Sequence, residues 1–385
     1  MNERFGIVAN ARSAWPDSGE LAALGAAWIR TIVYSFDELD AVLASHPSEV
    51  KVIALLNSEN DVVKNDLSGW REAIEQFGAR FAGRVHAVEC LNEWDLLHIP
   101  VETAADCART AAPILNNAGI ACLLGSVAGP SWPDALSRLA DSFSAEEKAQ
   151  FAGACFHPYG KSVNGFPPGF EFGEIEDAVR TANQLAGLPI YLTEYGIKLS
   201  DAGGDDGQRA YFEQTFEVLR QIPSDILAAA CYFCWTDRIG APEEQAEHAF
   251  GLLRQDDSPR PAHDLCCAIA ESGATPFDPI TGGPARPAPL TMAEKARVRV
   301  FGHTGPYRMQ ELQVAAYRVA EWAPARPIGI APDSPIFRYW QTHKDVGPAA
   351  TSELQIGPGD GGGKAVITTS GRIIRASARN QIEVV

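Results

Sequence analysis

The sequence contains no apolar run long enough to cross a membrane, since no segment approaches about 18 consecutive apolar residues. Basic residues are also scarce: 32 Lys and Arg stand against 49 Asp and Glu, a formal net charge of -17. This deficit argues against nucleic acids and anionic membranes as partners, because both are polyanions that bind through Lys and Arg. Neutral ligands suit the chain better.

The N-terminal residues MNERFGIVAN show no basic stretch followed by the apolar run of a secretory leader. We therefore expect a cytoplasmic protein, unless a leader has been removed from a secreted mature form. The sequence leaves the oligomeric state open.

No metal or redox motif stands out among the eight Cys and eight His. H-E-x-x-H does not occur, and Cys90, Cys155, Cys231 and Cys234 lie in apolar runs, where a thiol serves as a small hydrophobe. Cys231 and Cys234 have the spacing of a redox pair, but residues three apart in a strand point to opposite faces. We expect reduced thiols, no metal and no cofactor.

Short β-rich runs, by contrast, are abundant and alternate with helical patterns. Eight runs have the composition of buried strands: residues 5–9, 29–34, 50–56, 85–91, 120–127, 153–157, 189–193 and 229–235. The clearest helix covers 67–82, where apolar residues recur at steps of three and four, and the last is expected at about 260–272. Eight strands each followed by a helix predict an α/β fold, a (β/α)8 TIM barrel, over residues 1–272.

The remaining chain differs in composition from the barrel. Residues 273–290 are rich in Pro and Gly and predict a linker, and 291–385 predict a small accessory domain. Two segments, 316–329 and 336–349, share an aromatic-Arg start and a nearby Trp, which suggests a degenerate two-copy repeat. The aromatic residues there could line a glycan-binding surface or form a core of their own, and the chain is predicted to end in a β-hairpin that turns at Ser370-Gly371.

Candidate site residues lie where the predicted strands end, because the chemistry of such barrels sits on the C-terminal rim. Glu93 follows the fourth strand and Glu194 follows the seventh, so two glutamates arrive at one rim. The other candidates are Arg30, Asn92, His157, Tyr159 and Trp235, with Asn57, Trp94, Tyr195 and Asp237 as secondary rim residues.

Two carboxyl groups that flank a sugar oxygen are what glycoside hydrolysis requires, one as the proton donor and the other as nucleophile or base. Their environments must differ, so that one is protonated while the other is ionised. Arg30, if it reaches Glu194, would hold that carboxylate charged, since a nearby cation favours the ionised form. Trp235 could stack against the apolar face of a sugar ring.

These motifs resemble those of glycoside hydrolase clan A, the retaining (β/α)8 glycosidases, and are nearest to families 39 and 5. The resemblance covers residues 4 to 272 and rests on Asn92-Glu93, on Glu194 in YLTEYG, on Arg30, on His157 and Tyr159 in CFHPYG, and on Trp235. Family 5 usually has a histidine after the third strand, where Asn57 stands here, which argues against a cellulase or mannanase.

The resemblance implies a glycosidase that cleaves β-glycosidic bonds with retention, with Glu194 as the nucleophile and Glu93 as the acid/base. It further implies that Asn92 holds the sugar 2-hydroxyl and that Tyr159 donates a hydrogen bond to the nucleophile. A sugar-binding barrel without turnover and a transglycosylase using the same residues remain as alternatives. The sugar, the linkage and the choice between endo and exo action stay open.

Overall fold

The computed structural model describes residues 4–9, 15–44, 49–56, 67–129, 131–159, 175–237, 249–271, 309, 312, 334–343, 354–356, 362–368, 372–377 and 381–385. The chain forms two compact units, Met1–Ala288 and Pro289–Val385. The predicted linker at 273–290 and the first predicted repeat at 316–329 lie outside the described residues, so both stay predictions.

The first unit is a closed barrel of eight parallel strands in sequence order, in which β1 pairs with both β2 and β8. The predicted fold class and all eight predicted strands are confirmed. The strands are β1 (Phe5–Val8), β2 (Trp28–Val33), β3 (Lys51–Leu56), β4 (Ala87–Glu89), β5 (Ala121–Val127), β6 (Gly153–Phe156), β7 (Ile190–Tyr195) and β8 (Leu227–Tyr232).

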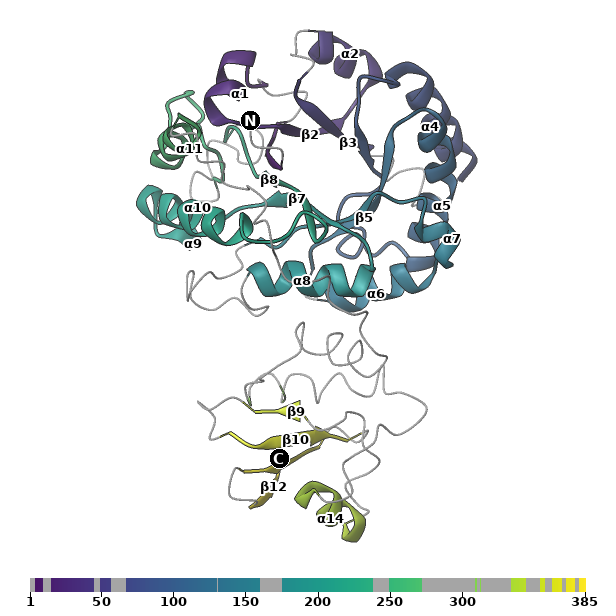
Figure 1. The fold of residues 1–385 in the computed structure, drawn as a ribbon, viewed down its shortest axis with the longest axis vertical. Coiled ribbons are helices and arrows are strands. Elements are labelled where there is room, and N and C mark those ends of the chain that lie inside the picture. Colours follow the sequence, from purple (N-terminus) through teal and green to yellow (C-terminus); the bar gives the residue numbers. More distant parts are fainter. Residues whose placement is uncertain are drawn as a thin grey trace. The chain divides into compact units, whose positions relative to one another are not determined.

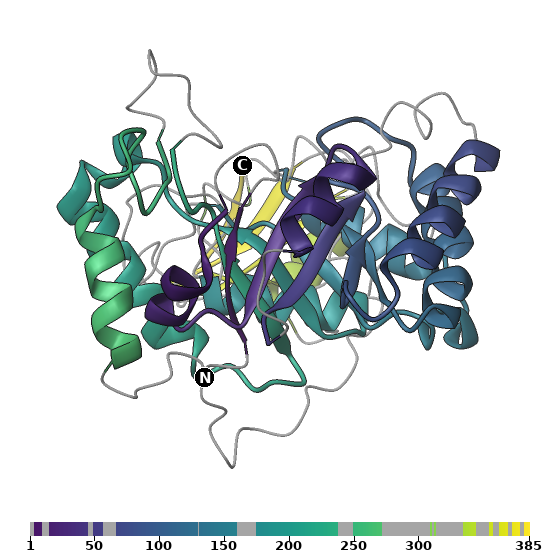
Figure 2. The same cartoon turned by 90° about the horizontal axis from the view of Figure 1, so that it is seen from above.

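Helices form a ring around these strands (Figure 1), and the turned view of Figure 2 shows the first strands lying between green helices on one side and blue helices on the other. None of the described helices is long and apolar enough to cross a membrane. The helices are α1 (Ser18–Leu24), α2 (Phe36–Ala44), α4 (Leu67–Phe81), α5 (Val101–Asn117), α6 (Trp132–Asp141), α7 (Ala145–Lys148), α8 (Ile175–Ala186), α9 (Leu199–Ala202), α10 (Asp205–Leu219) and α11 (Pro261–Glu271).

The helices at the predicted positions 67–82 and 260–272 are α4 and α11. In α4 the residues Trp70, Ile74, Phe77 and Phe81 are fully buried, as their spacing predicts. This helix thus packs one apolar side inward, while its other residues face solvent.

An apolar layer fills the barrel interior with side chains from every strand. Large rings from Trp28 and Tyr191 meet edge to face at 6.1 Å, and small residues such as Ala87 and Cys155 make room for them. Gly153 is required here, because a Cβ atom on it would lie 2.6 Å from the Tyr191 ring. This packed layer forms a floor below the carboxyl ends of the strands.

The second unit contains a four-stranded antiparallel sheet in the order β12-β11-β10-β9 and the helix α14 (Pro335–Thr342). The predicted hairpin is confirmed as the pair β10 (Lys364–Ile367) and β11 (Ile373–Ala376), although its turn lies outside the described residues. β9 (Leu354–Gln355) and β12 (Ile382–Val384) flank the pair. Phe337 and Tyr339 pack against the buried cluster of Ile336, Val366, Ile374 and Ala376, so these two aromatic residues serve a core.

Candidate active site

A polar layer lies directly above the apolar floor of the barrel. Side chains alternate along a strand, so the residue two places after a floor residue faces the interior one level higher. The floor residues Trp28, Ala87, Cys155, Tyr191 and Cys231 thereby place five further residues toward the carboxyl rim. These are Arg30, Glu89, His157, Thr193 and Phe233.

Arg30 and Glu89 form a buried ion pair in this layer. Both side chains are 0% exposed, and Arg30 Nε donates to a Glu89 carboxylate oxygen at 2.9 Å. Burial by itself would raise the pKa of Glu89, but Arg30 and His157 more than offset it and hold that pKa at about 2. Burial likewise opposes the charge on Arg30, and Glu89 and Glu194 raise the Arg30 pKa on balance. Both groups are therefore ionised at neutral pH.

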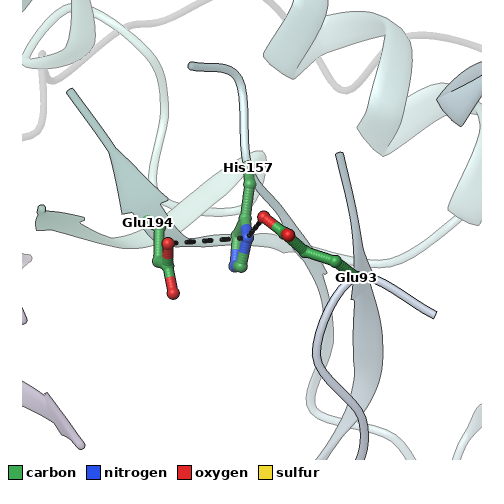
Figure 3. Close-up of side chains that lie close together, drawn as sticks. All are labelled: Glu93, His157 and Glu194. Atoms are coloured by element: carbon green, nitrogen blue, oxygen red, sulfur yellow. Dashed lines mark hydrogen bonds and ion pairs between the residues drawn. The ribbon is translucent and has the colours of Figure 1, made fainter. Parts of the chain in front are cut away.

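His157 lies between carboxylates on three sides. Nδ1 is 2.8 Å from Glu93 Oε1 and 3.9 Å from Glu194 Oε2, and Nε2 is 3.7 Å from Glu89 Oε1. Burial would lower the pKa of His157, but Glu194, Glu89 and Glu93 together raise it to about 9. The imidazolium form donates through Nδ1 to Glu93 and through Nε2 to the Thr193 hydroxyl, at 2.9 Å (Figure 3 shows the ring between Glu93 and Glu194).

Glu93 sits on a constrained turn after β4. Its φ is 41°, in the left-handed region that residues other than glycine rarely adopt. Ser126 from β5 holds this turn: its hydroxyl accepts from the Glu93 N–H at 2.9 Å, and its backbone N–H donates to Leu91 at 2.9 Å. Such strain persists only where neighbouring contacts enforce it, and it is typical of functional positions.

Glu194 reaches the site because β7 is irregular. Strict alternation would turn Thr193 inward and Glu194 outward, but the pairing of β7 with β8 shifts register between Leu192 and Tyr195. Both Thr193 and Glu194 consequently face the interior, where Thr193 contacts His157 and Glu194 contacts Arg30.

Glu194 accepts two hydrogen bonds, one on each carboxylate oxygen. Arg30 donates to Oε1, and the Tyr159 hydroxyl donates to Oε2. Burial and the neighbouring carboxylates raise the pKa of Tyr159 well above its ordinary value, so its hydroxyl remains a donor. The predicted contacts of Arg30 and Tyr159 with Glu194 are therefore both present.

The candidate acids lie close together. Ligand atoms of Glu93, His157 and Glu194 all lie within 4.8 Å of one another, a spacing that could also suit a metal ion. Near neutral pH both ring nitrogens of His157 carry protons, so a cation bound there would have to displace one of them.

Asn92 is hydrogen-bonded to Arg30, which also contacts Glu89 and Glu194. Arg30 Nη2 donates to Asn92 Oδ1 at 2.8 Å. Arg30 thus contacts Glu89, Asn92 and Glu194 at once. A planar guanidinium suits this role, since its five N–H donors point in fixed directions.

The expected stacking of Trp235 on a sugar stays a prediction. Trp235 is 2% exposed, and its ring lies 5.9 Å from the ring of His263 on α11. The aromatic residue of this segment that faces the site is Phe233, whose ring is 5.8 Å from that of Tyr159. Side chains alternate along a strand, so the inward-facing Ala229 and Cys231 predict that Phe233 also faces the interior. The prediction of Trp235 rested on its large indole ring.

Glu89 was missed by the sequence reasoning. An acid inside the apolar run VHAVECL was the available signal, and it was read as part of an ordinary strand. Of the secondary rim residues, Trp94 and Tyr195 are buried, at 4% and 0% exposure, and Asp237 forms an ion pair with Arg260. Asn57 lies outside the described residues.

No protein-family model matches the chain, and no curated protein matches it. Solved structures do share its fold. A GH5_18 protein from Streptomyces cattleya in complex with Manβ1-4GlcNAc is 17% identical, with a TM-score of 0.54 over 83% of this chain and 91% of that one. A family 39 glycoside hydrolase from Bacteroides cellulosilyticus is 15% identical, with a TM-score of 0.50 over 70% of this chain and 64% of that one.

A β-glucuronidase from an uncultured Clostridium is 11% identical, with a TM-score of 0.51 over 70% of this chain and half of that one. Members of families 5 and 39, which the motifs resemble, are thus among the proteins that share this barrel, so the expected (β/α)8 fold is confirmed. At such low identity the likeness concerns the fold, and the function must be argued from the site.

Proposed function

We propose that this protein is a retaining glycoside hydrolase that cleaves β-glycosidic bonds of an oligo- or polysaccharide. The observation that carries the proposal is a pair of glutamates on one barrel rim, with carboxylate oxygens of Glu93 and Glu194 within 4.8 Å of each other. Retaining enzymes keep their carboxyl groups about 5 to 5.5 Å apart, while inverting enzymes need roughly 6.5 to 9.5 Å to admit a water molecule. The short spacing supports double displacement.

The partners of the two acids support different roles for them. Glu194 accepts from Arg30 and Tyr159 and its side chain is 10% exposed, which suits a nucleophile that is fixed in direction. Glu93 has a more exposed side chain, at 23%, and contacts the His157 imidazolium. This suits a group that exchanges protons with substrate and water.

In the first step, a Glu194 oxygen forms a bond to the anomeric carbon while the glycosidic C–O bond breaks. Glu93 gives its proton to the leaving oxygen, so the aglycone departs as a neutral alcohol. In the second step, Glu93 takes a proton from water, the water oxygen attacks the anomeric carbon, and the Glu194 ester bond breaks. Both residues return to their starting states, and the sugar keeps its configuration after two inversions.

Other residues of the site would hold the sugar. Asn92, whose amide oxygen accepts from Arg30, would hold the 2-hydroxyl, a contact that strengthens in the transition state. Phe233 and Tyr159 offer aromatic surface to a sugar face, a role that Trp235 could fill only by losing the contacts that cover it. The acidic chain favours a neutral glycan over an acidic one.

The decisive test measures reducing-sugar release from β-linked glucans, xylans, mannans, galactans and bacterial cell-wall glycans by the wild type and by Glu194→Gln. Release by the wild type that falls at least about a thousandfold in the variant supports the proposal, since loss of a nucleophile removes the main chemical route. Glu176→Gln, at a surface position on α8, is the matched control and should keep full activity.

Two further outcomes separate the alternatives. Binding without release would indicate a sugar-binding barrel, and transfer to added sugar acceptors in place of water would indicate a transglycosylase. NMR of the first product formed shows whether the anomer is retained, and an inverted product would contradict double displacement. An aryl glycoside with a good leaving group should keep its first step in Glu93→Gln, because such a group leaves without protonation.

A further inference from the structure

A third buried carboxylate lies beneath the two proposed catalytic glutamates. Glu89 is 0% exposed and comes from the interior face of β4. One of its oxygens accepts from Arg30 Nε at 2.9 Å, and the other, Oε1, has no hydrogen-bond partner among the described residues and lies 3.7 Å from His157 Nε2. A buried carboxylate is costly unless it is paired, so its position between two cations calls for a reason.

The charged and titratable groups around His157 come from several elements of the barrel. Arg30 approaches from β2, Glu89 from β4, Glu93 from the turn after β4, Glu194 from β7, and Tyr159 from the turn after β6. Two of these acids change charge during the proposed reaction, since Glu194 becomes an ester and Glu93 alternates between acid and base. Glu89 contacts Arg30 and His157 and takes no part in either step, so it keeps its charge.

The charge balance of the layer depends on Glu89. With Glu93 protonated, the positive charges of Arg30 and His157 balance the negative charges of Glu89 and Glu194. In the glycosyl-enzyme, Glu194 is neutral and Glu93 is ionised, so the same two cations balance Glu89 and Glu93. Without Glu89, each state would carry one uncompensated positive charge in a buried layer. Loss of the His157 proton would remove that charge at the lowest cost in free energy.

Resting on the function proposed above, we propose that Glu89 is a positioning residue: its permanent charge keeps His157 an imidazolium, so that Nδ1–H stays on Glu93 Oε1 through both chemical steps. Glu93 Oε2 is then the oxygen that faces the substrate. Thr193, which accepts from Nε2, fixes the plane of the ring, and Arg30 fixes Glu89 in turn. The low pKa of Glu89, about 2, and the high pKa of His157, about 9, agree with this pairing.

The test follows the His157 ring nitrogens by NMR in the full-length protein labelled with ¹⁵N-histidine, without substrate. The His157 signals are identified by their loss in His157→Gln. In the wild type we expect an imidazolium at pH 7.5 that loses its proton near pH 9. In Glu89→Gln, which keeps an oxygen for Arg30 but removes the charge, the midpoint should fall by about one pH unit or more.

The matched control is Asp237→Asn, which removes another buried carboxylate paired with an arginine, at 4% exposure, and should leave the His157 midpoint unchanged. An unchanged midpoint in Glu89→Gln would overturn the proposal, as would a neutral His157 at pH 7 in the wild type. If Glu89→Gln does not fold, this wild-type measurement still decides, and Glu89→Asp, which retains the charge, should keep the imidazolium at pH 7.5.

Kinetics give a second readout once a substrate is found. Glu89→Gln should lower kcat more than it changes KM, and the alkaline limb of kcat should move to lower pH by the shift seen for His157. Glu89→Asp should restore that limb. If no glycan is cleaved, the proposed function fails by itself, while the NMR titration continues to test the role of Glu89.

Discussion

At the scale of single residues, the site is a set of charges that stabilise one another away from water. His157 is the residue most affected: it is 1% exposed, yet its carboxylate neighbours keep it protonated. An isolated buried imidazole would be neutral, because burial disfavours the charged form. The stability of the barrel must therefore depend on pH where this histidine titrates.

We predict that the free energy of unfolding decreases as the pH rises from 6.5 to about 9. The folded pKa of His157, about 9, lies above its ordinary value of 6.5, so the folded chain holds an extra proton across this window. The stabilisation is complete below pH 6.5 and lost as the pH passes 9, with a magnitude of about 3 kcal/mol. Urea unfolding at several pH values measures it.

His157→Gln is the comparison for this prediction, because it removes the titrating group. The decrease between pH 6.5 and 9 should be much smaller in this variant than in the wild type. Equal slopes for the two proteins would show that His157 is not the source.

At the scale of elements, a buried ion pair joins residues 233–237, which follow β8, to residues 249–260, which precede α11. Asp237 accepts from the Gly251 N–H at 2.7 Å and from Arg260, which also contacts Asp205 at the start of α10. Isolated bridges from Leu253 to Thr236 and to Pro259 fold this segment back along the end of β8. Asp237, a secondary candidate for substrate contact, therefore serves the packing of this segment.

Asp237→Asn should destabilise the barrel by about 3 kcal/mol, because it leaves the largely buried Arg260 with one charge partner fewer. The control Asp264→Asn changes an acid on α11 whose side chain is 70% exposed, and it should stay within about 0.5 kcal/mol of the wild type. Urea unfolding of both variants tests this. Equal stability of the two would mean that the Arg260 pair is worth no more than a surface charge.

At the scale of the whole molecule, the two units each have a core of their own. All described site residues belong to Met1–Ala288, and the cluster around Ile336 and Val366 belongs to Pro289–Val385. The role of the second unit, like the expected cytoplasmic location, stays a prediction. A glycan-binding role is not needed to explain Phe337 and Tyr339, which pack against that cluster.

A fragment of residues 1–288 should fold and cleave short soluble substrates at a rate within about twofold of the full chain, because compact units generally fold alone. Thermal unfolding and kcat on the substrate found in the glycan panel measure this. A fragment that folds but loses most of its kcat would show that the second unit contributes to catalysis.

Much of the site was predictable because strand ends in a parallel barrel converge. The apolar runs and their spacing located all eight strands, and the ends of the fourth, sixth and seventh placed Glu93, His157 and Glu194 on one rim. Arg30 was also found from its strand. These are consequences of local pattern combined with a topology that has few alternatives.

A local sequence pattern does not show where the pairing of two strands becomes irregular, or how deeply each side chain is buried. The register shift in β7 turns Glu194 inward. After β8, the ring that lies near Tyr159 is that of Phe233. Glu89 pairs with Arg30 and His157, which come from other strands. The sequence by itself determined the strands, the barrel and the two glutamates. The tertiary structure alone decided which charges balance one another, because pairing in a closed barrel joins residues that no local stretch of chain brings together.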